Sequence, residues 1–480
     1  MIADLKPYAE YKDSGLSWIG QVPGHWDLRQ PRQIGALLKG VGGTKEDALP
    51  AGVPCIRYGE LYTTHTYFVR RPKSFIHPDR AAHYTPLQYG DVLFAASGET
   101  LEDIGKSAVN LIVGTAVCGG DVIILRPTVP VHAPFLGYVM DCRPSAHQKA
   151  TMGRGTTVKH IYPDEIKHLL VPFPPVSEQA AIVRFLDWAN GRLTRAIRAK
   201  RKVIALLNEQ KQAIIHRAVT RGLDPSVLLK PSGIPWLGDI PQHWEVRRLK
   251  HISPRIGVGL VINPSSYFVD EMHPAPVPIL LGNNITPNGF RLRRVRHIGA
   301  DDNRRLGASR LVAGDVVVVR VGAPGVAAVV PPSLDGCNCA SVVIVRKHAS
   351  FVSHWLAHVF NSPLVASQID VVKYGAAQKQ FNISHAVDFL LPVPPSVEQQ
   401  EIVDAISGRT APLDRAMQAT EREIDLLREY RTRLVADVVT GKLDVREAAA
   451  RLPDEAAPDT TDDDADPSLD PEAADDAAIP

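Results

Sequence analysis

The sequence has no hydrophobic run long enough to cross a membrane and few residues that could form disulfides. A membrane-spanning helix needs about 18 or more consecutive apolar residues, and no such run is present. The first ten residues also lack the apolar core of a signal peptide. The five cysteines are odd in number and contain no C-x-x-C pair, which argues against a disulfide framework and a zinc knuckle. These features predict a cytoplasmic protein with no membrane segment.

Catalytic motifs are missing as well. Gly105-Lys106-Ser107 matches the end of a phosphate-binding loop, but Thr100 stands where that loop needs its first glycine. Asp164 and Glu165 are residue types of a metal nuclease, yet residues 383–387, at the corresponding place in the second half, contain no carboxylate. We therefore interpret Asp164 and Ser384 as helix N-caps. Without a G-x-G-x-x-G or H-E-x-x-H motif, we predict no catalytic residues, no metal site and no cofactor site in this chain.

The small net charge of +2 hides an uneven distribution. All 54 Lys and Arg residues lie before Leu452, whereas eleven of the 52 acidic residues lie after it. The rest of the chain therefore carries 54 basic against 41 acidic residues, a net charge of +13. A basic body predicts a polyanionic partner. The acidic segment is rich in Asp, Ala and Pro, and its composition predicts disorder.

Two long segments of the sequence repeat each other. Residues 171–224 and 391–444 share a Pro-x-Pro-Pro-x-x-Glu-Gln start and a Leu-Leu…Val-Thr…Leu-Asp end, at a constant offset of 220 residues. Between these ends, apolar residues recur at steps of three and four, which places them on one side of an α-helix. Each segment is predicted to be one long helix that begins after a proline pair, with Ser177 or Ser396 as its N-cap.

Each apolar stripe is as narrow as the seam of a coiled coil, so the simplest partner for one helix is the other. We expect antiparallel packing, which would place two domains at opposite ends. A helix from Ser177 to Thr220 would be about 66 Å long at a rise of about 1.5 Å per residue. The residues predicted to contact the partner helix are Ile182, Leu186, Leu193, Ile197, Ile204, Leu207, Ile402, Ile406, Leu413, Ile424, Leu427 and Leu434.

A second repeat opens each half of the chain. Ser14–Trp26 aligns with Ser232–Trp244, and seven of the thirteen positions are identical, including both tryptophans. The Gly and Pro residues mark turns, and we interpret the tryptophans as packing anchors rather than ligand contacts. After each opening comes a block with β-type runs and short helices, which predicts a mixed α+β domain. The interiors of the two blocks differ far more than their ends.

The chain is therefore predicted to form two tandem mixed α/β domains, related by a pseudo-twofold internal repeat, with two long helices packed as an antiparallel coiled coil. The predicted boundaries are a first domain at 1–171, a central long helix at 172–222, a second opening and domain at 223–391, a distal long helix at 392–444, and an acidic tail at 445–480.

Two kinds of exposed loop recur in both halves. One follows the Gly-Asp strand, at residues 97–106 and 320–322, and the other precedes the capped helix, at residues 154–159 and 374–380. Glycine allows close approach of the backbone, and Arg, Lys, Gln, Ser and Thr read base edges or hold phosphates. For any single residue, an ordinary turn remains the alternative. The basic face of the first long helix, which includes Lys211, is either close to phosphates or simply solvated.

Together, the doubled S-G-x-x-W-x-G-x-x-P-x-x-W opening, the Gly-Asp-Val strand, the glycine-rich loop and the start of the long helix resemble the DNA specificity subunit of type I restriction-modification systems. Residues 97–106 also look like one recurrent version of its first recognition domain. The resemblance covers Ser14–Asp444. It implies that each domain is a target recognition domain that reads one part of a split, asymmetric DNA site. The residues assigned to DNA binding are Arg57, Ser97, Glu99, Thr100, Lys106, Arg154, Thr156, Thr157, Lys159, Asn283, Asn284, Arg320, Tyr374, Gln378, Lys379 and Gln380.

The resemblance also implies partners. The long helices would dock two methyltransferase subunits, which bind S-adenosylmethionine, flip the target adenine and methylate it. Restriction and translocase subunits that use ATP and Mg would join for cleavage. Two other hypotheses stay open, a stand-alone DNA-modifying enzyme and a duplicated scaffold that binds only protein.

Overall fold

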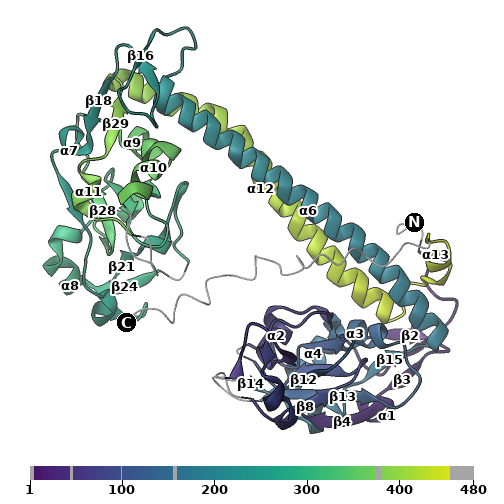
Figure 1. Ribbon diagram of the computed structural model, residues 1–480. Coiled ribbons are helices and arrows are strands. Elements are labelled where there is room, and N and C mark those ends of the chain that lie inside the picture. Colours follow the sequence, from purple (N-terminus) through teal and green to yellow (C-terminus); the bar gives the residue numbers. More distant parts are fainter. Residues whose placement is uncertain are drawn as a thin grey trace. The chain divides into compact units, whose positions relative to one another are not determined.

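The computed structural model describes residues 5–43, 47–98, 100–154, 159–293, 295–372 and 380–453. The chain divides into two compact units, Met1–Ala199 with Arg422–Pro480 (unit 1) and Lys200–Glu421 (unit 2). Each unit has its own sheets and its own hydrophobic core (Figure 1). The predicted boundary of the acidic tail at residue 445 is wrong, because residues 445–453 belong to unit 1: they include the helix α13 (Arg446–Ala450), and Val445 and Ala449 are buried in the core. The residues after Pro453 lie outside the described part of the chain.

Unit 1 is built on a five-stranded and a four-stranded sheet. The first has the order β4 (Gly35–Lys39), β13 (Val122–Pro127), β9 (Val92–Ala95), β11 (Ser107–Asn110), β6 (Tyr67–Val69). The second has the order β7 (Phe75–Ile76), β5 (Val53–Ile56), β12 (Ala116–Cys118), β8 (Thr85–Leu87). The helices of this unit are α1 (Pro31–Ile34), α2 (Tyr58–Thr63), α3 (Ala133–Asp141), α4 (Arg143–Met152), α5 (Pro163–Ile166) and α13 (Arg446–Ala450).

Unit 2 has two four-stranded sheets. One has the order β19 (Ile256–Val258), β28 (Val342–Val345), β25 (Val316–Val319), β26 (Ala327–Val329), and the other β20 (Phe268–Val269), β24 (Arg296–Gly299), β21 (Pro276–Leu280), β27 (Asn338–Cys339). A short pair, β22 (Ile285–Thr286) and β23 (Gly289–Phe290), forms a separate two-stranded sheet. The helices are α7 (Leu249–Ile252), α8 (Ala300–Arg305), α9 (Ser353–Phe360), α10 (Pro363–Val372) and α11 (Ile383–Ala386).

The central strands of both units are buried on both faces. In β9, Val92 and Phe94 belong to one core cluster and Leu93 to another, because successive side chains of a strand point to opposite faces. The four valines of β25 divide in the same way between two clusters of unit 2. A strand that is buried on both faces is expected to have a continuous run of apolar residues, as these strands do. A strand with one solvated face would alternate apolar and polar residues.

Two small two-stranded sheets recur in the same places in the two units. A hairpin formed by β1 (Tyr11–Asp13) and β2 (Gln21–Pro23) opens unit 1, and β16 (Leu229–Pro231) with β17 (Asp239–Pro241) forms its counterpart. The strand after each hairpin pairs with the strand before a long helix: β3 (Asp27–Arg29) with β15 (Val171–Phe173), and β18 (Glu245–Arg248) with β29 (Leu390–Val393).

The two long helices predicted from the repeat are present as α6 (Val176–Arg221) and α12 (Ser396–Val439), and they pack together (Figure 1). In unit 1, the beginning of α6 shares a core with the end of α12, where Ile182 and Leu186 lie in the same cluster as Leu434. In unit 2, the end of α6 shares a core with the beginning of α12, where Ile215 lies in the same cluster as Ile402.

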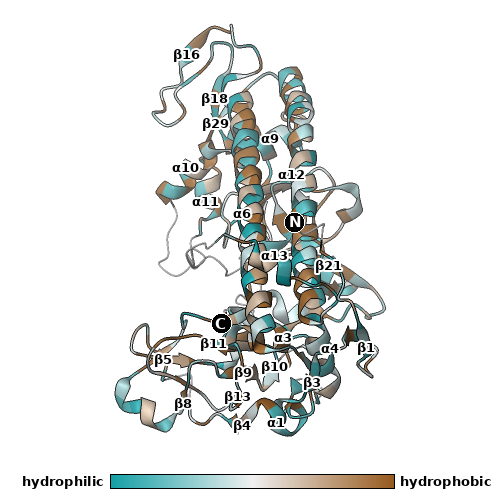
Figure 2. Cartoon of the chain, turned by 90° about the vertical axis from the view of Figure 1, so that its right-hand side faces the viewer, coloured by the Kyte–Doolittle hydropathy of each residue, from teal (hydrophilic) through white to brown (hydrophobic). Residues whose placement is uncertain are grey.

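The apolar stripe is more deeply buried at the helix ends than in the middle. Ile182, Leu186, Ile402 and Ile406 are at most 1% exposed. Leu193, Ile197, Ile424 and Leu434 are also buried, whereas Ile204, Leu207, Leu413 and Leu427 are half-buried. The end residues pack into a domain core as well as against the other helix. Hydrophobic and hydrophilic residues alternate along α6 and α12 (Figure 2).

All four predicted helix caps are wrong. Ser177 is the second residue of α6, and Ser396 is the first residue of α12. Both helices start after the proline pair, where a glutamine side chain closes the turn: Gln179 Nε2 donates to the carbonyl of Pro174 at 2.8 Å. Asp164 and Ser384 likewise lie inside α5 and α11. In α5, Glu165 Oε2 accepts from the Tyr162 amide at 2.8 Å, which leaves Asp164 free to pair with Lys167.

Candidate nucleic-acid interface

In unit 1, the two loops singled out in the sequence lie side by side. The segment after β9 forms the short strand β10 (Ser97–Gly98), which pairs antiparallel with β14 (Lys159–His160). The Ser97 hydroxyl lies 3.0 Å from His160 Nδ1, and Arg154 forms a further β-bridge with His160. Residues far apart in the sequence are thus brought to one edge of the unit. His160 was not among the predicted residues, although it is next to Lys159.

The corresponding loops of unit 2 meet in the same way. Val321, two residues after the end of β25, forms an antiparallel bridge with Gln380, the residue equivalent to His160. Arg320 spans this junction, since its Nε donates to the Phe381 carbonyl at 3.1 Å and its Nη2 donates to Asn382 Oδ1 at 3.2 Å. The structure therefore places Arg320 and Gln380 together, as it does Ser97 and Lys159 in unit 1.

Several predicted DNA-binding residues are held by neighbours within their own unit. Thr100 is exposed, and its hydroxyl donates to Asp103 Oδ2 at 2.7 Å, which closes a turn. Lys106 Nζ lies 2.9 Å from the buried Asp141 Oδ2. That carboxylate raises the pKa of Lys106. Arg154 is largely exposed, with its guanidinium 3.3 Å from Glu165.

The remaining described residues of the set lie in different surroundings. Asn284 is buried, accepts from the Leu281 amide at 2.9 Å and donates to the Arg291 carbonyl at 3.1 Å, so its amide closes a local turn. Asn283 beside it is exposed, and Arg57 is half-buried at the start of α2. Glu99, Thr156, Thr157, Tyr374, Gln378 and Lys379 lie outside the described residues. DNA contact by this set stays a prediction.

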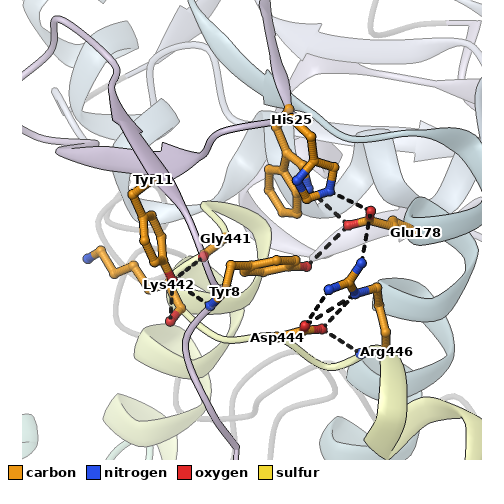
Figure 3. A network of polar contacts seen from close by, with 9 residues as sticks. Tyr8, Tyr11, His25, Glu178, Gly441, Lys442, Asp444 and Arg446 are labelled. Carbon is orange, nitrogen blue, oxygen red and sulfur yellow. Dashed lines mark hydrogen bonds and ion pairs between the residues drawn. The ribbon is translucent and has the colours of Figure 1, made fainter.

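The histidine-tryptophan pair of each opening is anchored by the glutamate at the start of a long helix. In unit 1, Trp26 Nε1 donates to Glu178 at 2.9 Å, and His25 Nε2 lies 2.6 Å from the same carboxylate (Figure 3). Glu178 also accepts from the Tyr8 hydroxyl at 3.3 Å, and Arg446 lies 3.6 Å away. The sequence shows Glu178 only as part of a repeat. Its partners His25 and Trp26 lie 153 and 152 residues before it in the chain.

Unit 2 repeats this anchor with fewer partners. Trp244 Nε1 donates to Glu398 at 3.0 Å, and His243 Nε2 lies 2.7 Å from it. Because Trp26 and Trp244 are fully buried, the prediction of packing anchors is confirmed for them. Trp18 and Trp236 are each 40% exposed, and the Trp18 ring lies against His147 with the ring centroids 5.7 Å apart.

The Gly-Asp motif before β9 and β25 forms a buried ion pair in each unit. Asp91, 1% exposed, receives Arg126 Nε at 3.0 Å and Nη2 at 2.7 Å. Asp315 receives Arg346 Nη1 at 2.7 Å and the Lys347 amide at 3.0 Å. These carboxylates stabilise the strands from which the candidate loops extend, and they are not available to a ligand.

Lys211, a basic residue of α6, already has polar partners within unit 2. Its side chain is buried, and Nζ lies 2.6 Å from Asp414 Oδ1 and 3.0 Å from Asn288 Oδ1. Lys211 therefore fixes α6 to α12 within unit 2. It is a poor candidate for a phosphate contact.

The candidate metal ligands do not cluster in the described part of the chain. His354 and His358 are four residues apart on α9. No group of three His, Cys, Asp or Glu side chains that could hold a metal ion is found in the described ranges. Burial lowers the pKa of His358 to about 4. All five cysteines are free and buried, and burial raises the pKa of Cys55 to about 11. Within the described ranges, no helix is both long and apolar enough to span a membrane.

Comparison with known proteins supports the resemblance found in the sequence. The type I restriction enzyme MjaX specificity subunit of Methanocaldococcus jannaschii is 25% identical over 444 residues, which cover 89% of this chain and 96% of that protein. The EcoKI specificity subunit of Escherichia coli K12 is 20% identical over 443 residues, which cover 88% and 90%. Over most of its length, the chain is similar to type I restriction enzyme specificity subunits. The predicted resemblance is thereby confirmed, although no family model matches the chain.

A chain of one solved structure has the same fold as this chain, with a TM-score of 0.58 at 16% identity. That structure is described as showing the complex assembly and conformational transition of the type I R-M system. The match covers 88% of this chain and 99% of the other.

Proposed function

We propose that this chain is the DNA-recognition subunit of a type I restriction-modification complex, with one target recognition domain in each unit. One observation supports this most directly. In both units, the loop after the Gly-Asp strand lies against the loop before the short helix, but the residues differ: Ser97 and His160 in one, Val321 and Gln380 in the other. The same scaffold with different side chains suits two readers of different half-sites.

The DNA site would then be bipartite and asymmetric. Each reader would approach the major groove with its paired loops, since base edges there carry the distinguishing pattern of donors and acceptors. Arg320 in unit 2 and the exposed Arg154 in unit 1 are our first candidates for contact with DNA. Both would exchange their present partners for bases or phosphates on binding.

The long helices would form an antiparallel pair that sets the gap between the half-sites. This proposal is supported by the two separate contacts of α6 with α12, start to end in unit 1 and end to start in unit 2. Lengthening both helices by about one turn should widen the gap and leave the half-sites unchanged. An unchanged gap would count against the ruler.

Catalysis would belong to partner subunits, which we infer to be two methyltransferase subunits, joined for cleavage by restriction and translocase subunits. S-adenosylmethionine, ATP and Mg would be bound by those partners rather than by this chain. The soluble complex would act on chromosomal DNA in the cytoplasm.

The direct test is to map methylated adenines in DNA from cells with and without this gene. We expect one bipartite motif to lose methylation when the gene is deleted. With Arg320→Ala in unit 2, methylation should weaken through one half-site, while the sequence preference at the other half-site stays as in the wild type. A methylation pattern that is identical in both cells would reject the proposed function.

Two rival functions predict different results. A stand-alone modifying enzyme would bind S-adenosylmethionine without any other subunit. A scaffold that binds only protein would show no sequence-specific DNA binding in the assembled complex, whereas a DNA reader should lose affinity steeply as salt rises.

A further inference from the structure

The hairpin that opens each unit carries a tryptophan that is partly exposed to solvent. The opening hairpins are residues 11–23 and 229–241, and their exposed tryptophans are Trp18 and Trp236, each 40% exposed. Trp18 has one ring contact within unit 1, with His147 at 5.7 Å between ring centroids. Single exposed apolar side chains are common, but here the same exposure recurs at the same place in both units.

Folding explains the other repeated residues of the hairpins. The Ser14 and Ser232 hydroxyls accept from backbone amides two residues on, at 3.2 and 3.1 Å. The repeated glycines all have positive φ and open space where a Cβ would stand, so backbone conformation requires them; they are Gly15, Gly20, Gly233 and Gly238. The residues after the two tryptophans, Ile19 and Leu237, are 2% and 9% exposed, and Leu237 belongs to the core of unit 2.

The charge of the hairpins argues against DNA as their ligand. Each hairpin contains one lysine and one aspartate, Lys12 with Asp13 and Lys230 with Asp239, so neither has a net charge. Protein surfaces that bind the phosphate backbone carry excess Lys and Arg. A half-exposed tryptophan on a neutral, rigid turn is instead typical of the centre of a protein–protein contact.

The repetition indicates how many partners there are. The candidate DNA loops differ between the units, but the two hairpins keep the same turn, the same outward tryptophan and the same neutral charge. Two equal surfaces fit two copies of one protein. We propose that Trp18 and Trp236 are contact points for two copies of the modification subunit, one copy on each opening hairpin. The inference rests on the function proposed above, which supplies a partner of this kind.

Titration of the full chain with the purified modification subunit of the same system tests the proposal. Native mass spectrometry gives the stoichiometry, and analytical ultracentrifugation gives the Kd of each step. Wild type should bind two copies. Trp18→Ala and Trp236→Ala should each weaken one of the two sites at least about 30-fold, the effect typical of a hot-spot tryptophan, and the double variant should weaken both. Tyr89→Ala in unit 1 and Met272→Ala in unit 2 remove side chains that are 61% and 90% exposed and should bind like wild type.

A second measurement needs no variant. Hydroxyl-radical footprinting of wild type should show Trp18 and Trp236 protected by the modification subunit and not by a DNA duplex alone. Thermal unfolding of each variant shows whether the chain is still folded, and Trp18→Phe should restore part of the affinity that Trp18→Ala loses.

The outcomes separate this inference from the proposed function. If wild type binds no modification subunit, the proposed function fails and this inference fails with it. If wild type and the double variant both bind two copies with similar Kd, only the hairpin proposal fails. Protection of the tryptophans by DNA alone would also overturn it.

Discussion

The buried Lys149–Asp141 pair of unit 1 should be replaceable by the neutral arrangement of unit 2. Lys149 is fully buried, with Nζ 3.2 Å from Asp141 Oδ1, 3.1 Å from the Ser107 hydroxyl and 2.8 Å from the Met140 carbonyl. Lys106 lies 2.9 Å from the other oxygen of Asp141. We predict that the double variant Asp141→Asn/Lys149→Ile is about as stable as wild type.

Unit 2 shows why this pair is dispensable. The residue 220 positions after Asp141 is Asn361, whose side chain accepts from the Ala327 amide at 2.9 Å and donates to the Ala327 carbonyl at 2.8 Å. The residue at the position of Lys149 is Ile369, which is 3% exposed in the core. An amide and an aliphatic side chain therefore fill the same place without any buried charge.

The two single variants should differ in cost. Removing one partner of a buried ion pair costs about 3–5 kcal/mol because the other charge is left uncompensated. Asp141→Asn leaves the buried Lys149 ammonium with neutral acceptors only, so we expect a loss of about 3 kcal/mol. Lys149→Ile leaves Asp141 paired with Lys106, so the loss should be about 1–2 kcal/mol. The double variant should lie within about 1 kcal/mol of wild type.

The pH dependence provides an independent check. Burial lowers the pKa of Lys149 below its ordinary value of 10.5, and Asp141 opposes that shift. In Asp141→Asn the pKa of Lys149 should fall further. The unfolded chain then binds more protons than the folded chain between this lower pKa and about 10.5, so stability rises with pH in that window. The deficit of Asp141→Asn should shrink from pH 7 to pH 9.

Hydrogen exchange followed by mass spectrometry is the suitable assay, because a chain with two units need not unfold in one step. Peptides of β11, α3 and α4 report the free energy of opening around the pair. The reasoning is refuted if Asp141→Asn costs less than about 1 kcal/mol, or if the double variant loses as much as the two single variants together.

Three further predictions follow from single contacts. Glu178→Ala should cost about 2–3 kcal/mol and Glu398→Ala about 1–2 kcal/mol, measured by hydrogen exchange in each unit, because the Glu398 side chain is 22% exposed and has fewer partners; equal losses would contradict this. Burial holds the pKa of His358 near 4, so unit 2 should lose stability as pH falls from about 6.5 towards 4, and His358→Gln should flatten that slope in thermal unfolding. Gly441→Ala should destabilise more than Gly15→Ala, measured by the urea midpoint, since both have positive φ but only at Gly441 would a Cβ lie 2.2 Å from Pro23.

Local patterns in the sequence were sufficient to predict the long helices and the central strands. Steps of three and four residues predicted α6 and α12, and the β-type runs are present as strands such as β9 and β25. The caps failed because Ser and Asp near a helix start are typical caps, whereas here the proline pair and Gln179 determine where the helix begins.

The candidate DNA interface was predictable only as separate loops. That Ser97 would pair with His160, or Val321 with Gln380, depends on strand pairing between residues about 60 positions apart, which periodicity does not contain. Asn284 was chosen as a residue type that reads bases, but its amide is used up by backbone groups of its own turn. Residue type alone does not show whether a polar side chain has spare hydrogen-bonding capacity.

The repeated Glu-Gln pair accounts for what is constant in the two units. In unit 1, Glu178 holds the buried Trp26, while Gln179 accepts from the His132 amide at 2.9 Å, directly before α3. In unit 2, Gln399 accepts from the Val352 amide at 2.8 Å, directly before α9. One turn of each long helix is thus bonded to the opening hairpin segment and to the main helix of its unit. Since neither contact involves the candidate DNA loops, those loops can change in sequence while the start of the helix stays fixed.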